Sequence, residues 1–149
     1  MNTNKRITEI EDVKINVKLK LSALWTAVMF LYVYADIKAL FRPGILEQMI
    51  AGELSIGGTG VLISQTFLLV SAIIMAIPSV MILLSLTLKA RVNRWVNIIL
   101  GIVYTAIIIM TLLSGGAWAY YIFYAIIEIV LTTLVVWYAW KWPKQDSNV

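Results

Sequence analysis

The sequence predicts an all-α protein, a four-helix transmembrane bundle with a short interfacial amphipathic helix between spans one and two. Composition is the first observation: of 149 residues, 61% are hydrophobic and only 13% are charged, whereas a soluble domain is about half apolar and about a quarter charged. The second is that the apolar residues form four long stretches, and roughly 20 apolar residues suffice for a helix to cross a ~30 Å hydrocarbon core. The surplus apolar surface is therefore expected to face lipid.

Lysine and arginine flank these stretches unevenly, which is the third observation. Five lie in residues 1–20, three in the turn near residue 90 and two at the C-terminal end, against two, Lys38 and Arg42, at the far end of the first span. The positive-inside rule then predicts that both termini and the middle turn are cytoplasmic. We expect cytoplasmic tails at 1–20 and 143–149 around a single membrane domain at 21–142.

The first span is expected over about 21–41. It ends at Arg42-Pro43-Gly44, where proline removes a hydrogen-bond donor and glycine adds backbone freedom. In the segment 44–60 the apolar side chains gather on one side of a helical projection, which is typical of a short helix on the membrane surface. Its glycine-rich end at 57–60 predicts a flexible return. A sharper alternative is that this segment is a lid over a cavity between the spans.

The second span is longer than the hydrocarbon core requires, and Pro78 inside it predicts a kink. Ala72 and Ala76 form a small-xxx-small pair, which predicts a close approach between helices. The segment Val13 to Leu21 before the first span alternates with a strand-like period, but a lone strand has no partner here, so an interfacial segment is expected. The remaining spans are expected over about 61–88, 95–113 and 119–142.

The third span carries Asn97, Gly101 and Thr105 at intervals of four residues. These small and polar residues share one helix face, so this face is predicted to pack inward. The fourth span begins and ends with tryptophan and tyrosine. Aromatic residues at both ends of a span predict belts at the two membrane interfaces.

The chain contains no histidine and no cysteine. Imidazole and thiolate metal ligands, histidine haem ligation and histidine-based acid–base catalysis are therefore excluded. No nucleophile–base pair, metal cluster or phosphate loop can be assembled, so we expect no enzyme activity, no cofactor and no metal. The basic residues flank apolar segments rather than forming a groove-sized patch, so nucleic acid is not an expected partner.

Two carboxylates lie within the apolar segments. Glu128 is nine residues into the fourth span, roughly 13 Å from its start at ~1.5 Å per residue, and Asp36 is shallower in the first span. A charge at mid-depth costs at least ~2.5–3.5 kcal/mol, and protonation or pairing lowers that cost. Glu128 is therefore expected to point inward. It either forms an interhelical hydrogen bond, to Tyr32, Asn97, Thr105 or a serine of the second span, or binds a proton or cation in a polar cavity.

Other polar side chains complete the candidate intramembrane site. For Asp36, the alternatives are a pair with Arg42 or Lys38, or contact with interfacial water. The basic turn is a separate candidate, for contact with lipid head groups, through Lys89, Arg91 and Arg94. The candidate intramembrane polar site comprises Glu128, Asp36, Tyr32, Tyr124, Asn97 and Thr132.

Several motifs resemble those of a family of small bacterial four-span integral membrane proteins of undefined function. The resemblance covers about Leu21 to Trp142, and the run from Ile77-Pro78 through LLSLTLKARVNRWVNI to Gly101 is its most specific part. Trp25-Thr26, the run Tyr32 to Asp36, Pro43-Gly44, and Glu128 with the aromatic end at 137–142 also belong to it. The resemblance implies four helices and a bacterial inner (plasma) membrane, and it brings no activity. A looser likeness to DoxX-like four-helix proteins rests on architecture.

These observations favour a non-enzymatic membrane accessory or interaction protein, because packed helices are all that such a role needs. Its expected partners are the lipid bilayer and either further copies of the chain or another membrane protein. The alternative is a small oligomeric proton-coupled transporter that uses Glu128. A lipid-modifying enzyme is the weakest alternative, since the sequence supplies no nucleophile–base pair.

Overall fold

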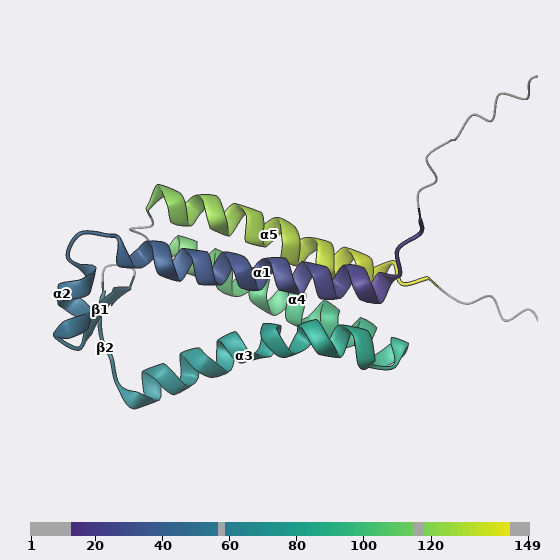
Figure 1. Ribbon diagram of the computed structural model, residues 1–149, viewed down its shortest axis with the longest axis horizontal. Helices are drawn as coiled ribbons and strands as arrows, with labels where there is room; N and C mark the ends of the chain where they lie inside the picture. The colour runs from purple at the N-terminus through teal and green to yellow at the C-terminus, as the bar shows by residue number, and fades with distance from the viewer. Residues whose placement is uncertain (1–12, 57–58, 115–117, 144–149) are drawn as a thin grey trace, which may run out of the picture.

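The computed structural model describes residues 13–56, 59–114 and 118–143. Within these ranges the chain forms five helices and one two-stranded sheet (Figure 1). Four of the helices are long and apolar enough to cross a membrane, which confirms the predicted fold class. They are α1 (Val17–Leu40), α3 (Gln65–Thr87), α4 (Ala90–Leu113) and α5 (Ala119–Trp140).

A small unit connects the first two spans. It consists of the short helix α2 (Ile45–Ile50) and an antiparallel hairpin of β1 (Glu53–Ile56) and β2 (Thr59–Leu62). The short helix confirms the prediction for this segment, but the hairpin was not predicted. Its strands are only four residues long and show no clear alternation, while the backbone pairing of Glu53 with Leu62 and of Ile56 with Thr59 holds them together. Gly57 and Gly58, part of the predicted flexible return, lie outside the described residues.

The long helices form an open bundle. Helix α1 packs between α3 and α5, α4 packs along α5, and α3 touches α4 only sparsely. In Figure 1 both ends of the described chain lie at the same end of the bundle as the α3–α4 turn, and the unit of α2 and the hairpin lies at the other. We call these the basic end, after Lys18, Lys20, Lys89, Arg91 and Arg94, and the hairpin end.

Two spans begin earlier than predicted. Helix α1 starts at Val17 rather than 21, because the Asn16 side chain caps it by accepting a 2.9 Å hydrogen bond from the Lys18 amide. Much of the alternating segment that was expected to be interfacial is thus helical. Helix α4 starts at Ala90 rather than 95, so Arg91 and Arg94 lie on the helix. Hydrophobicity alone underestimates the length of both helices, because long cationic side chains at a helix end extend into the interface while the backbone stays helical.

The second and fourth spans are shorter than predicted. The first two residues of the expected 61–88 span belong to β2, and α3 begins at Gln65, where the Ser64 hydroxyl accepts a 3.1 Å hydrogen bond from the Phe67 amide. Helix α5 begins as predicted at Ala119 and ends at Trp140 rather than 142.

The tightly packed part of the core lies toward the basic end. Leu21 and Trp25 of α1, Met81 of α3, and Val135 and Ala139 of α5 are at most 1% exposed. The hairpin-end half of α3 is different, since the buried residues of this helix begin only at Pro78. Ala72 and Ala76 are exposed, so this pair makes no close helix contact within the chain, and close packing there against another chain stays a prediction.

Pro78 lies buried inside α3, and Figure 1 shows the helix changing direction near its middle, as predicted. Proline has no amide hydrogen, so the carbonyl four residues before it, that of Ile74, loses its helical partner. The Tyr104 hydroxyl of α4 donates a 2.5 Å hydrogen bond to this carbonyl. One side chain therefore satisfies the backbone group that the bend leaves free.

The predicted inward face of α4 is confirmed. Asn97 and Gly101 are buried, and the hydroxyls of Thr105 and Thr132 lie 2.7 Å apart across the α4–α5 contact. A Cβ atom added at Gly101 would meet Val136 Cγ2 at 2.7 Å and the Thr132 carbonyl oxygen at 3.2 Å. Glycine is thus needed here because the backbone of α5 approaches closely.

We predict that Gly101→Ala destabilises the bundle by about 1–3 kcal/mol through overpacking against α5. Unfolding of the purified protein in mixed micelles by increasing denaturing detergent measures this change. Gly60→Ala is the matched control, because a Cβ there meets no atom within 4 Å, and it should shift stability by less than about 0.5 kcal/mol. Equal stability of the two variants would contradict the close approach.

Candidate functional site

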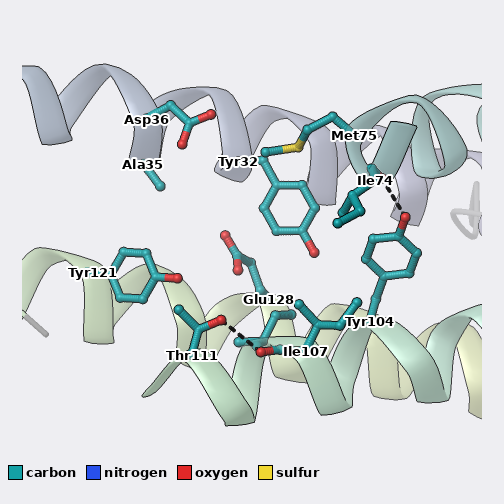
Figure 2. A pocket seen from close by; sticks show the side chains of 11 residues that line it. Tyr32, Ala35, Asp36, Ile74, Met75, Tyr104, Ile107, Thr111, Tyr121 and Glu128 are labelled. Atoms are coloured by element: carbon teal, nitrogen blue, oxygen red, sulfur yellow. Dashed lines mark hydrogen bonds between the residues drawn. The ribbon is translucent and has the colours of Figure 1, made fainter. Parts of the chain in front are cut away.

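A cavity of about 150 Å³ lies between the long helices in the half of the bundle toward the hairpin end (Figure 2). All four spans contribute to its wall, whereas the short helix and hairpin contribute no lining residue. The lid alternative for segment 44–60 therefore gains no support from the described contacts. The lining residues are Tyr32, Ala35 and Asp36 of α1, Ile74 and Met75 of α3, Tyr104, Ile107, Ile108 and Thr111 of α4, and Tyr121 and Glu128 of α5.

Glu128 lies near the middle of α5 and is only 6% exposed. Its carboxylate points from α5 into the cavity toward α1 (Figure 2). Across the described ranges, no hydrogen bond or ion pair reaches this carboxylate. Two partners considered from the sequence are engaged elsewhere, because Asn97 bonds Trp25 and Thr105 bonds Thr132. The geometry thus favours the cavity alternative over the interhelical hydrogen bond.

Asp36 lies one turn before the end of α1 and is exposed at the mouth of the cavity. The ion pair considered for it is not formed among the described residues. Lys38 instead lies over the Phe41 ring, with Nζ 5.6 Å from the centroid, and Arg42 lies over the Trp118 ring at 5.0 Å. The cavity therefore carries two carboxylates and no lining lysine or arginine.

Three tyrosines from three helices complete the cavity (Figure 2). Tyr32 comes from α1, Tyr104 from α4 and Tyr121 from α5. Tyr104 lies on the basic-end side, where its ring meets that of Trp25 edge-on, with centroids 5.8 Å apart and an interplanar angle of 80°. It therefore separates the cavity from the packed core around Trp25.

The predicted site contains one of these tyrosines, Tyr32, together with a fourth-span tyrosine that lies elsewhere. Tyr124, expected near Glu128, does not line the cavity, and its ring instead lies beside those of Tyr120 and Phe123 at 6.5 and 5.8 Å. At about 3.6 residues per turn, a residue seven positions before Glu128 is closer to it in angle than one four positions before. This spacing singles out Tyr121. Tyr104 and Thr111 lie on another helix, and no sequence signal linked them to Glu128.

Asn97 belongs to a separate buried network and not to the cavity. Its Oδ1 accepts hydrogen bonds from Trp25 Nε1 at 2.7 Å and from the Ser85 hydroxyl at 3.4 Å. Its Nδ2 donates to Asn93 O at 2.9 Å and to Asn93 Oδ1 at 2.6 Å. Both ends of the amide are thus satisfied, so Asn97 is a structural residue that ties α1 and α3 to α4.

Thr132 is also apart from the cavity. Its hydroxyl is paired with Thr105 and contacts the Glu128 carbonyl of its own helix at 2.9 Å. Of the six predicted residues, the structure therefore brings together Glu128, Asp36 and Tyr32.

The cationic side chains gather at the basic end. Lys89 and Arg91 are exposed, whereas Arg94 is half-buried over the Trp140 ring at 5.8 Å. Lys18 Nζ donates to the carbonyls of Leu86 and Leu88 at 3.1 and 2.7 Å, and so satisfies backbone groups at the end of α3. Contact of Lys89, Arg91 and Arg94 with lipid head groups stays a prediction, and the position of Arg94 over the Trp140 ring fits it.

The groups that line the cavity are of the kinds that can accept a proton or attract a cation. Two carboxylates and three phenol groups present oxygen atoms and aromatic faces, and no lining side chain is cationic. Among the described residues, no group of three or more histidine, cysteine, aspartate or glutamate side chains could hold a metal ion.

The four apolar spans and the intramembrane carboxylate cavity define a small multi-pass integral membrane protein. The chain belongs to a family of unknown function (DUF6326), whose model matches residues 7–148. The expected membership in a family of undefined function is thereby confirmed, while its bacterial origin and the likeness to DoxX-like proteins stay predictions. No curated protein and no solved structure matches the chain.

We predict that Asn97→Leu lowers the free energy of unfolding by about 1–2 kcal/mol, because it removes the acceptor of the Trp25 N–H and the donor to Asn93 Oδ1 in an apolar core. Detergent-induced unfolding, followed by tryptophan fluorescence, measures the loss. Thr87→Val is the control, since this exposed hydroxyl bonds only the Leu83 carbonyl of its own helix. A loss no larger than that of the control would show that the network contributes little.

Proposed function

We propose that this protein is a small proton-coupled membrane transporter in which Glu128 alternately binds a proton and a cationic solute. The observation that carries the proposal is the buried Glu128 carboxylate, which faces the cavity without a partner among the described residues. An ionised carboxylate at mid-depth costs at least ~2.5–3.5 kcal/mol, and a bound proton or cation removes most of that cost. The buried Asn97 and Thr132 are satisfied inside the bundle, so Glu128 is an exception that calls for a ligand.

The shape of the bundle supports access from one end. Asp36 at the mouth is exposed and Glu128 is buried deeper, while Trp25 and the residues packed around it close the basic end. Release toward the basic end requires a second conformation. The hairpin-end half of α3 supplies a mobile wall in this proposal, because it has no buried residue before the bend at Pro78.

The proposal includes a homo-oligomer. Helix α3 contacts α4 only sparsely, so this side of the cavity is left to lipid or to a second copy of the chain. The protein carries out no covalent chemistry in this proposal, uses no cofactor and binds no nucleic acid.

We also propose a location in a bacterial inner (plasma) membrane with both termini cytoplasmic. Of the nine lysine and arginine residues in the described ranges, seven belong to segments that meet at the basic end. Anionic lipid and the positive-inside rule favour this end in the cytoplasm.

Single-cysteine labelling tests the orientation, because the chain contains no cysteine of its own. A membrane-impermeant maleimide should label Ser114→Cys in intact cells, since Ser114 ends α4 at the hairpin end. It should label Val13→Cys, before α1, only after lysis. The reverse pattern would place the hairpin end in the cytoplasm.

Infrared difference spectroscopy of the full chain in lipid tests the proton site. We predict a protonated-carboxyl band that falls reversibly as pH rises, shifts rapidly on deuterium exchange and is missing from Glu128→Gln. Glu47→Gln, at an exposed position on α2, should keep the band and serves as the control. A carboxyl that stays protonated, exchanges slowly and affects only stability would contradict the transporter and identify Glu128 as a structural group.

A membrane accessory or interaction protein is the second candidate. The observation that favours it is α2, which exposes Leu46 and Ile50 at 53% and 87% beyond the ends of the spans. An apolar surface at that level suits contact with the bilayer interface and with a membrane protein partner. A Glu128 carboxyl whose infrared band does not change with pH would favour this candidate, because an interaction role needs no titrating group.

A further inference from the structure

The geometry points to a small organic ammonium ion, a quaternary or alkylated amine, as the solute that the Glu128 cavity holds. This inference rests on the proposed function and adds the chemical class of the ligand. It depends on three independent properties of the cavity: its charge, the kind of groups that surround Glu128, and its size.

The charge of the cavity selects a cation. Glu128 and Asp36 line it, and no lysine or arginine does. The basic side chains at the hairpin end lie against aromatic rings instead, Lys38 over Phe41 and Arg42 over Trp118. An anion would meet two carboxylates with no compensating charge, whereas a cation pairs with Glu128 in a site where the low dielectric strengthens the attraction.

The groups that face Glu128 select an organic cation over a metal ion. Tyr32 and Asp36 face it from α1, Tyr104 and Thr111 from α4, and Tyr121 from α5 itself, while α3 contributes only aliphatic and thioether groups (Figure 2). Calcium, a hard metal cation, takes six to eight oxygen ligands. The two separate carboxylates of the cavity do not approach such a set. Aromatic faces around an ammonium group instead give cation–π attraction.

The volume limits the size of the ligand. About 150 Å³ is comparable to the engineered protein cavity that binds benzene, so it accommodates an ion of roughly that bulk. Ile107, Ile108 and Met75 supply apolar contact for the alkyl groups. Tetramethylammonium has the charge, the apolar surface and the approximate bulk, and is the probe of choice.

Titration calorimetry of the full chain in lipid nanodiscs tests the inference with tetramethylammonium. We expect saturable binding that potassium does not displace at equal concentration. Where Glu128 is protonated, binding should release up to one proton, seen as a heat that varies with the ionisation enthalpy of the buffer. Displacement by potassium would overturn the organic class in favour of an inorganic cation.

Variants locate the binding. Glu128→Gln should weaken the binding of tetramethylammonium by at least about tenfold. Asp36→Asn, at an exposed position where folding is not at risk, should weaken it by a smaller factor. Tyr32→Leu should weaken it by roughly 2- to 30-fold, and Tyr32→Phe by no more than about twofold, because the ring rather than the hydroxyl attracts the cation. Tyr124→Leu is the matched control and should bind like the unmodified chain, since Tyr124 lies outside the cavity.

The outcomes separate this inference from the proposed function. If Glu128 titrates in the infrared experiment but tetramethylammonium does not bind, the ligand class is wrong and the proton site stands. If Glu128 does not titrate, the proposed function itself fails. Binding that survives both Glu128→Gln and Asp36→Asn would place the ion elsewhere on the protein and overturn the inference.

Discussion

The hydrogen bonds of Asn97 are the interaction on which the bundle depends. This side chain accepts from Trp25 of α1 and donates to Asn93, whose own amide donates to the Ser85 carbonyl at the end of α3. A bilayer core offers no water to these groups, so each must find a protein partner. Three spans thereby acquire one register at the basic end, and α5 joins them through Val135, Ala139 and the close contact at Gly101.

The closely packed basic end contrasts with the half of the bundle toward the hairpin end, which holds the cavity. The buried Ser85, Asn93 and Asn97 in the basic-end half are hydrogen-bonded to one another, whereas Glu128 and Asp36 in the other half face a cavity. A protein can hold a carboxylate unpaired at this depth only at a cost in stability, and such costs are typical of sites that bind a proton or ligand. The contrast between the two halves is therefore the observation that supports the proposed proton and solute site.

Much of this architecture could be predicted from the sequence, because hydrophobic length, Pro78 and the spacing of Asn97, Gly101 and Thr105 each act locally. The starts of α1 and α4 could not be predicted in this way, since Lys18 and Arg91 are charged and yet lie in the first turn of each helix.

Three of the six residues predicted for the site line the cavity, and their positions also follow from local spacing. The depth of Glu128 and the helix face shared by Tyr32 and Asp36 can be read along the chain. The place of Tyr104 depends on how α4 meets the bend of α3, which only tertiary structure fixes.

Tyr104 has two roles that lie at opposite ends of one side chain. Its ring forms part of the cavity wall against Trp25, and its hydroxyl holds the Ile74 carbonyl that Pro78 leaves free. Breaking that bond would leave a backbone acceptor without a partner in an apolar setting. The Tyr104 ring and the hairpin-end half of α3 are therefore constrained to move together. The thermodynamic linkage is reciprocal: whatever displaces the ring changes the angle of α3, and lateral pressure of the lipid on α3 is transmitted to the wall of the cavity.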